Sequence, residues 1–221
     1  MLSRDYILAQ IEMISGLVAR LMRLREDGDE QGAVEEVEEG YREMFGLEPR
    51  LVGLLPSDFL LNKLRTGDYL DLPRGLSLAV LMREDAVNYG SQGNDIEQYQ
   101  RLVGSLKVFL AVAQEHQLLP EHLAVYDVQA ALDHMADYEL PLDLKFDLFH
   151  YYEDAGEYAH AEDMLHEAID DSDRNQEIID EGIQFYEWLL GHSDEELVAG
   201  NLPRMEVEES LAQLRRLKTG L

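Results

Sequence analysis

The chain of 221 residues contains no cysteine and no long apolar run. The missing cysteine excludes disulfide bonds and thiolate chemistry, and it suits a reducing compartment. No segment approaches the roughly 18 consecutive apolar residues of a membrane-spanning helix. The chain opens with the charged residues Arg4 and Asp5 and continues as an amphipathic segment, unlike the apolar region of a signal peptide. We therefore expect a cytoplasmic protein.

Basic side chains are scarce and unevenly placed. There are 18 of them against 46 acidic ones, which gives a formal net charge of −28. Residues 108–203 contain only Lys145 and Arg174 against 24 acidic side chains. Nucleic acids and anionic membranes bind clustered Lys and Arg, so neither is an expected partner. The acidic surface either keeps the protein soluble by self-repulsion or forms a docking face for a basic partner.

Apolar residues recur at helical spacing through most of the chain, and glycine or proline interrupts each series. The widest apolar stripe, in residues 3–25, contains Ile7, Ile11, Ile14, Val18 and Leu21. Its width predicts a helix that packs on two sides or forms a homodimer. Ser193 and Glu196 match a capping box, which predicts a helix start. Since no stretch alternates as a strand would, the sequence predicts an all-α fold of about ten or eleven helices.

The clearest loop in the first half of the chain is Gly90-Ser-Gln-Gly93. Because closely spaced glycines mark turns and linkers, we predict a boundary there. It separates an N-terminal helical lobe, residues 1–92, from a C-terminal helical lobe, residues 93–221. A single continuous domain is the alternative.

One set of spacings occurs twice. Gaps of 4, 5, 4 and 3 residues separate Tyr152, Gly156, Ala161, Leu165 and Ala168. The same gaps separate Leu24, Gly28, Ala33, Val37 and Gly40. A turn glycine followed by a small residue five positions later is typical of two helices folded into a hairpin, since the small residue lets them approach closely. Both segments are therefore predicted to form helical hairpins.

The downstream copy resembles the tetratricopeptide repeat, whose period is about 34 residues. Ala161-x-x-x-Leu165 lies nine residues after the aromatic Tyr152, and Gly156, Tyr158 and Ala168 match further positions of that repeat. Phe149 and Asp173 depart from it, since they replace a small residue and a closing proline. The resemblance implies a hairpin at 142–172 within an irregular right-handed array of antiparallel helical hairpins.

The whole chain is also similar to an uncharacterised bacterial family of tetratricopeptide-like proteins, mostly Gram-positive. The segments that carry this similarity are Arg4-Asp5-Tyr6-Ile7, Phe185-Tyr186-x-x-Leu189, Ser193-Asp194-Glu195-Glu196-Leu197 and Gly200-Asn201-Leu202-Pro203. The family has no assigned activity, so this similarity implies a fold and no mechanism.

In a tetratricopeptide repeat the first helix lines the concave binding face. Alignment to that motif implies five partner-binding positions, Asp143, Phe146, His150, Glu153 and Asp154. Members of the repeat family that bind chaperones hold a C-terminal carboxylate with Lys, Arg and Asn at such positions. Acidic residues repel a carboxylate, so we expect a basic or aromatic peptide segment as the partner.

No motif in the chain carries catalytic chemistry. There is no G-x-S-x-G, no glycine-rich phosphate loop and no G-x-G-x-x-G. A metal site could draw on His160, Glu162, His166 and Asp170, although an exposed acidic helix with two histidines explains them equally simply. We expect neither a metal nor another cofactor. Among the aromatic residues, Tyr152, Tyr186 and Trp188 are predicted to lie in the core, and Tyr151 could point outward.

Taken together, these features predict a non-catalytic protein- or peptide-interaction module. The first alternative is an intracellular small-ligand or peptide sensor of tetratricopeptide type. The remote alternative is a metal-dependent enzyme.

Overall fold

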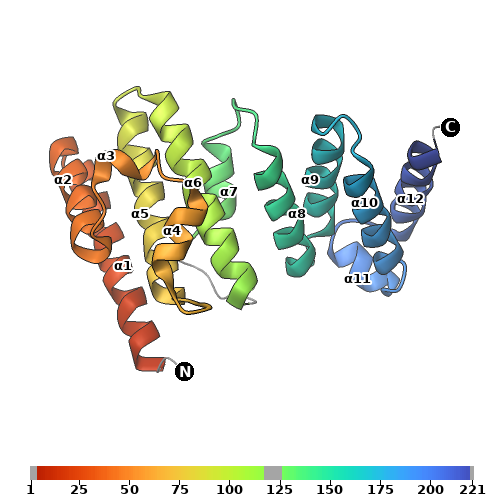
Figure 1. Ribbon diagram of the computed structural model, residues 1–221, viewed down its shortest axis with the longest axis horizontal. Coiled ribbons are helices and arrows are strands. Elements are labelled where there is room, and N and C mark those ends of the chain that lie inside the picture. The colour runs from red at the N-terminus through yellow and green to blue at the C-terminus, as the bar shows by residue number, and fades with distance from the viewer. Residues whose placement is uncertain (1–3, 117–125, 220–221) are drawn as a thin grey trace. The chain divides into compact units, whose positions relative to one another are not determined.

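The computed structural model describes residues 4–116 and 126–219, and within residues 4–11 only the backbone is described. These residues form twelve α-helices, one π-helical turn and a ribbon of two short strands (Figure 1). The predicted all-α class is therefore confirmed. None of the described helices has an apolar stretch of the length that a membrane span requires.

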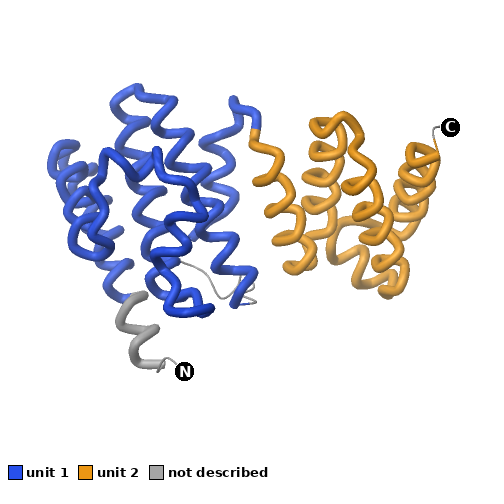
Figure 2. Tube along the Cα trace, in the orientation of Figure 1, with its two compact units in different colours: residues 1–139 blue, residues 140–221 orange. Residues whose placement is uncertain are grey.

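The chain divides into two compact units, residues 1–139 and residues 140–221, which Figure 2 shows in different colours. This division differs from the boundary expected at 92/93. Gly93, with a φ of +70°, lies in the turn between two helices that pack tightly against each other within unit 1. The glycine-rich loop therefore marks a hairpin and not a linker.

Unit 1 contains most of the helices and the ribbon. Its elements are α1 (Arg4–Glu26), α2 (Glu30–Gly40), η1 (Tyr41–Phe45, the π-helical turn), α3 (Pro49–Val52), α4 (Ser57–Leu64), β1 (Arg65–Thr66), β2 (Tyr69–Leu70), α5 (Leu72–Ser91), α6 (Asp95–His116) and α7 (Val128–Asp133). The two strands pair antiparallel, with Arg65 opposite Leu70. Asp29, Asp71 and Asp127 begin α2, α5 and α7 by accepting a hydrogen bond from a backbone N–H of the first turn.

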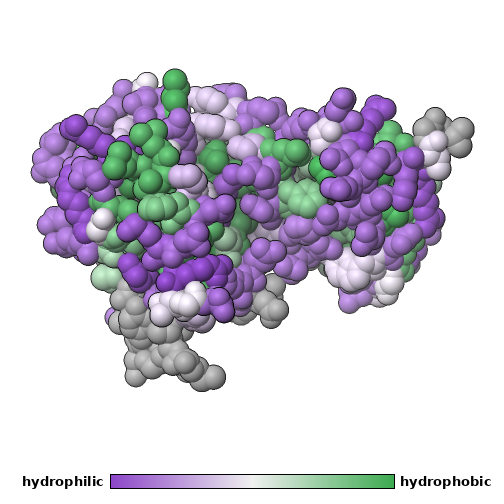
Figure 3. All heavy atoms as spheres, in the orientation of Figure 1, coloured by the Kyte–Doolittle hydropathy of each residue, from purple (hydrophilic) through white to green (hydrophobic). Residues whose placement is uncertain are grey.

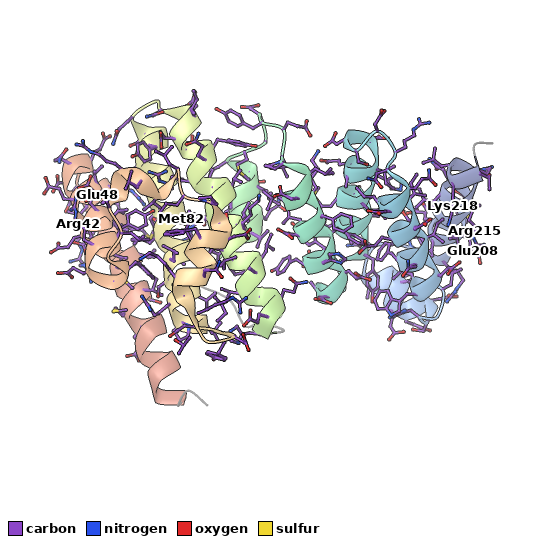
Figure 4. The ribbon with its side chains drawn as sticks, viewed as in Figure 1. Arg42, Glu48, Met82, Glu208, Arg215 and Lys218 are labelled. Carbon is purple, nitrogen blue, oxygen red and sulfur yellow. The ribbon has the colours of Figure 1, made fainter. Side chains whose placement is uncertain are left out.

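Helices α5 and α6 form the centre of unit 1. Two glycines allow their close approach. A Cβ at Gly75 would lie 2.4 Å from Val112 Cγ2, and a Cβ at Gly104 would lie 2.5 Å from the Cε of Met82. Met82 is labelled on α5 in Figure 4. A larger side chain at Gly75 would push against the stiff, β-branched Val112, whereas one at Gly104 would displace the flexible end of Met82.

A buried ion pair joins α5 to α6. The Arg101 side chain is 1% exposed, and its Nε donates a hydrogen bond of 2.7 Å to Asp85 Oδ2. The Tyr41 hydroxyl donates to the same oxygen at 3.2 Å. Burial raises the pKa of Asp85, while the hydrogen bond from Arg101 opposes that rise. Gly53 leaves room for the guanidinium, since a Cβ there would lie 1.3 Å from Arg101 Nη1.

Unit 2 consists of five helices. They are α8 (Leu142–Ala155), α9 (Tyr158–Asp171), α10 (Gln176–Leu189), α11 (Asp194–Ala199) and α12 (Arg204–Thr219). The main packing partners are α8 with α9 and α10 with α12. The capping box predicted at Ser193 and Glu196 is present at the start of α11.

The residues of the two predicted hairpins lie where pairs of helices meet. In unit 2 the buried members are Tyr152, Tyr158, Ala161, Leu165 and Ala168, and Gly156 adopts a φ of +73° between α8 and α9. In unit 1, Ala33 and Val37 are buried, Leu24 is half-buried, and Gly28 adopts a φ of +75° between α1 and α2. Positive φ values favour glycine because it has no Cβ.

Helix α1 buries one side of its predicted stripe. Ile14 and Leu21 are buried and Val18 is half-buried, whereas Met22 is exposed. The side chains of Ile7 and Ile11 lie outside the described residues.

Candidate functional site

In unit 2, helices α8 and α10 present aromatic and acidic side chains on one surface. We call this surface the acidic aromatic face and define it by Phe146, His150, Glu153, Glu181 and Trp188. The three residues of α8 lie four and three positions apart, which places them on one side of that helix. Glu181 and Trp188 lie seven positions apart, on one side of α10. The face therefore follows from helical periodicity together with the pairing of the two helices.

His150 connects the two helices of this face. Its Nδ1 lies 3.4 Å from Glu153 Oε2 on its own helix, and its Nε2 lies 3.1 Å from Glu181 Oε1 on α10. The Phe146 ring meets the imidazole edge to face, with centroids 5.1 Å apart. The hydrogen bond to Glu153 raises the pKa of His150, the charges of Glu181 and Asp154 add to the rise, and partial burial opposes it. The surrounding carboxylates thus favour the imidazolium form.

Packing beneath the face holds α8 and α10 together. The rings of Phe149 and Phe185 meet at a centroid distance of 5.2 Å and an interplanar angle of 82°. Gly182 lies on the buried side of α10. A Cβ at this position would be 2.7 Å from Leu214 Cδ1 and 3.0 Å from Leu165 Cδ2, so the glycine brings α10 close to both α9 and α12.

Trp188 is the only tryptophan of the chain, and it is 45% exposed. The prediction that it lies in the core is therefore wrong, although Tyr152 and Tyr186 are buried as predicted. Its indole packs against His192 at 4.3 Å and Tyr158 at 5.8 Å between ring centroids. These contacts fix the indole while leaving much of it open to solvent. An indole face attracts cations through its quadrupole, most strongly where carboxylates surround it.

Two carboxylates lie near Tyr158, the ring that meets the indole. Burial raises the pKa of Tyr158, and the nearby charges of Glu196 and Glu153 raise it further. Residues 140–221 together carry 21 acidic and 6 basic side chains. Figure 3 shows hydrophilic residues over much of the visible surface of unit 2.

Several basic side chains of unit 2 are engaged in ion pairs, and Arg204 also donates to the carbonyls of Leu190 and His192, close to Trp188. Arg215 and Lys218, both labelled on α12 in Figure 4, pair with Glu187 at 2.7 Å and Asp180 at 2.6 Å. Lys145 of α8 is buried and pairs with two residues of α9, Glu167 at 3.1 Å and Asp171. Among the five residues that define the face, His150 is the cationic group.

The structure places the five predicted partner-binding residues in two groups. Phe146, His150 and Glu153 lie together on the acidic aromatic face. Asp143 is exposed in the first turn of α8, where its carboxylate accepts a hydrogen bond of 3.0 Å from the Leu144 N–H. Asp154 is exposed at the other end of α8 and acts on His150 through its charge.

Two residues of the face come from α10 and were not predicted. Glu181 reaches His150 only because α10 packs beside α8. Trp188 could have been found from the sequence, since it follows Asp154 by 34 residues, the same interval that separates the starts of α8 and α10. A search for the repeat period beyond the 142–172 hairpin would have indicated it.

The two histidines that a metal site could draw on, His160 and His166, contact different residues. The Nε2 of His166 lies 3.1 Å from the Tyr186 hydroxyl, which donates a hydrogen bond of 2.7 Å to Glu162. His160 is exposed, 3.0 Å from Glu157. Within residues 4–116 and 126–219, no three His, Asp or Glu side chains are grouped so that they could hold a metal ion.

Comparison with known proteins identifies a family for this chain. A family model described as a family of unknown function (DUF6483) matches residues 1–219. Neither a curated protein nor a solved structure matches the chain.

Proposed function

The chain belongs to DUF6483, a family of unknown function, and from the geometry of unit 2 we propose that it is a non-catalytic peptide-binding module. In this proposal the acidic aromatic face captures a basic segment of another protein. The partner is a protein or peptide, and neither a nucleic acid nor a membrane is involved.

We propose that unit 2 is an irregular pair of tetratricopeptide-like hairpins. The first hairpin is α8 with α9, and the second is α10 with α12, interrupted by the short α11. Two observations support this arrangement. The first helices begin 34 residues apart, which equals the typical period of that repeat. Small residues, Ala161 and Gly182, also occupy the contacts between helices. In such hairpins the first helices line the binding surface, as α8 and α10 do here.

The exposed indole of Trp188 beside carboxylates carries the proposal. One Lys or Arg side chain of a peptide can place its charge on the indole, while other basic side chains of the same peptide meet Glu153 and Glu181. A cation on an aromatic ring contributes about 0.5–1 kcal/mol at an exposed site and about 2 kcal/mol when it is desolvated. The net negative charge of unit 2 would also speed the approach of a basic segment, and salt would weaken this effect.

Trp188 provides the assay, because its fluorescence reports on the face without any label. We would titrate the protein with a peptide that alternates Arg and Phe, and with a second peptide in which Glu replaces each Arg. The expected result is a saturable change in Trp188 emission with the basic peptide only. Raising the salt concentration to about 0.5 M should weaken that binding, since charges are then screened beyond about 4 Å.

Charge-reversed variants test whether the basic peptide binds at the acidic aromatic face. Replacing Glu153 and Asp154 with lysine should weaken binding of the basic peptide at least tenfold. The matched control replaces Glu208 and Glu209, which are adjacent exposed acidic residues on α12, with lysine (Figure 4 labels Glu208). This control should bind as the unmodified protein does. Equal binding by both variants, or no response of Trp188 to the basic peptide, would contradict the proposal.

A further inference from the structure

Unit 1 contains a cavity of about 280 Å³ that lies between α1 and the continuous helix formed by α2 and η1. Figure 1 shows these helices side by side at the N-terminal end of the chain. The apolar part of the lining comes from Ile14 and Leu17 of α1, which are buried, and from Met44 of η1. Met13, which is 43% exposed, also lines the cavity.

The polar part of the lining is predominantly acidic. Glu36, Glu39 and Glu43 lie three and four positions apart, so they form one stripe on the side of α2 and η1 that borders the cavity. Among the lining residues that the structure describes, Arg20 of α1 is the one basic residue, and its guanidinium is 2.6 Å from Glu36 Oε1. Glu39 and Glu43 are exposed residues at the border of the cavity, so their carboxylates can meet a guest whose apolar part lies deeper, while Arg20 is engaged with Glu36.

The π-helical turn forms part of this cavity. Such turns are rare, and they occur often at functional sites. Two residues of the turn anchor it in the core, since Tyr41 and Phe45 are buried and the Tyr41 hydroxyl donates a hydrogen bond to Asp85. Gly46, with a φ of +60°, ends the turn. Glu43 and Met44, which lie inside the turn, face the cavity.

We infer that this cavity binds a small organic cation, namely an amine on a short aliphatic or aromatic group. The hydrocarbon lies against Ile14, Leu17 and Met44, and the ammonium group meets Glu39 and Glu43. A volume of 280 Å³ accommodates about nine water-sized groups, which matches an amine of this size. The inference goes beyond peptide binding by unit 2, because it gives unit 1 a small-ligand site of its own.

Hexylamine is a suitable probe, with hexan-1-ol and hexanoate as neutral and anionic probes of equal chain length. Binding is followed by NMR of ¹³C-labelled methionine methyl groups, with the signals of Met13 and Met44 assigned by Met→Leu variants. We expect hexylamine to shift both signals saturably, with a dissociation constant of about 0.1–1 mM, as typical ligand efficiencies give for a ligand of this size. Hexan-1-ol should bind at least fivefold more weakly, and hexanoate should not shift either signal.

Replacing Glu39 and Glu43 with glutamine should weaken hexylamine binding at least fivefold and leave hexan-1-ol binding unchanged. The matched control is Glu35→Gln, which removes one carboxylate from an exposed position of α2 outside the cavity lining. Equal affinity for hexylamine and hexan-1-ol would overturn the inference, as would unshifted Met13 and Met44 signals. The inference would also be overturned if sedimentation showed a dimer and the NMR signal of Met13 shifted on dimerisation without ligand. A second copy of the chain would then occupy the site. The response of Trp188 to basic peptides is measured separately, so the two proposals can fail independently.

Discussion

Replacing Gly53 with alanine probes the buried ion pair of unit 1 by adding one methyl group. Gly53 has φ and ψ of −71° and −14°, which any L-residue adopts, so alanine causes no backbone strain. The new Cβ would lie 1.3 Å from Arg101 Nη1. The guanidinium must therefore leave its position, and it loses the 2.7 Å hydrogen bond to Asp85.

The expected cost follows from the burial of this pair. Removing one partner of a buried ion pair costs about 3–5 kcal/mol. Arg101 stays attached in the variant, and it can turn toward Glu97, which is 3.3 Å from its Nη1 and partly exposed. We therefore expect a loss of about 2–3 kcal/mol, which is the lower end of this range reduced by the small gain that alanine brings by restricting the unfolded chain. With a urea dependence of about 2 kcal/mol per M, the unfolding midpoint should fall by about 1 M.

Urea unfolding followed by far-UV circular dichroism measures this loss. The matched control is Gly16→Ala in α1, where the nearest atom to the new Cβ is Arg20 Nη1 at 3.7 Å, so we expect no loss of stability. In an Arg101→Met background, Gly53→Ala should cost much less, because the displaced group is gone. A loss below about 1 kcal/mol, or an equal loss in both backgrounds, would refute the reasoning.

The dependence on pH gives a second check on the same pair. Burial raises the pKa of Asp85 and Arg101 opposes the rise, so displacing Arg101 raises that pKa further. A raised pKa in the folded state stabilises the protein below the unfolded pKa, and this stabilisation is lost as pH rises through the folded pKa. The loss of unfolding free energy caused by Gly53→Ala should therefore be smaller in acid than at neutral pH.

Two further predictions concern unit 2. The pKa of His150 is raised from its ordinary 6.5 by Glu153 and Glu181, so Glu181→Gln should lower it, as measured by NMR titration of the imidazole. The stabilisation from this pair is complete below the ordinary pKa and is lost as pH rises through the raised value; an unchanged pKa in the variant would contradict the contact. Gly156→Ala should cost about 1–2 kcal/mol, because an L-residue is strained in the left-handed region. Gly156 has a φ of +73°. Urea unfolding followed by Trp188 fluorescence measures the cost, and Gly156→Asn should lose less stability, since Asn tolerates the left-handed region better than alanine.

Some features of the site were predictable and others were not. Phe146, His150 and Glu153 were placed on one binding face by alignment to the tetratricopeptide motif, and their spacing of four and three residues puts them on one side of α8. The contact of His150 with Glu181 was not predicted, because it joins two helices that are not consecutive in the chain. Trp188 was expected in the core because it recurs at helical spacing with buried residues, yet it lies at the edge of the apolar stripe of α10.

The sequence by itself determined the all-α class, the turns at Gly28 and Gly156, and the capping box at Ser193. Each depends on groups a few residues apart, where backbone hydrogen bonds and local sterics decide the conformation. The tertiary structure alone decided the division at 139/140, the burial of Arg101 against Asp85, and the surface shared by α8 and α10. These depend on which distant helices pack together, and that choice is made by the complementarity of whole surfaces.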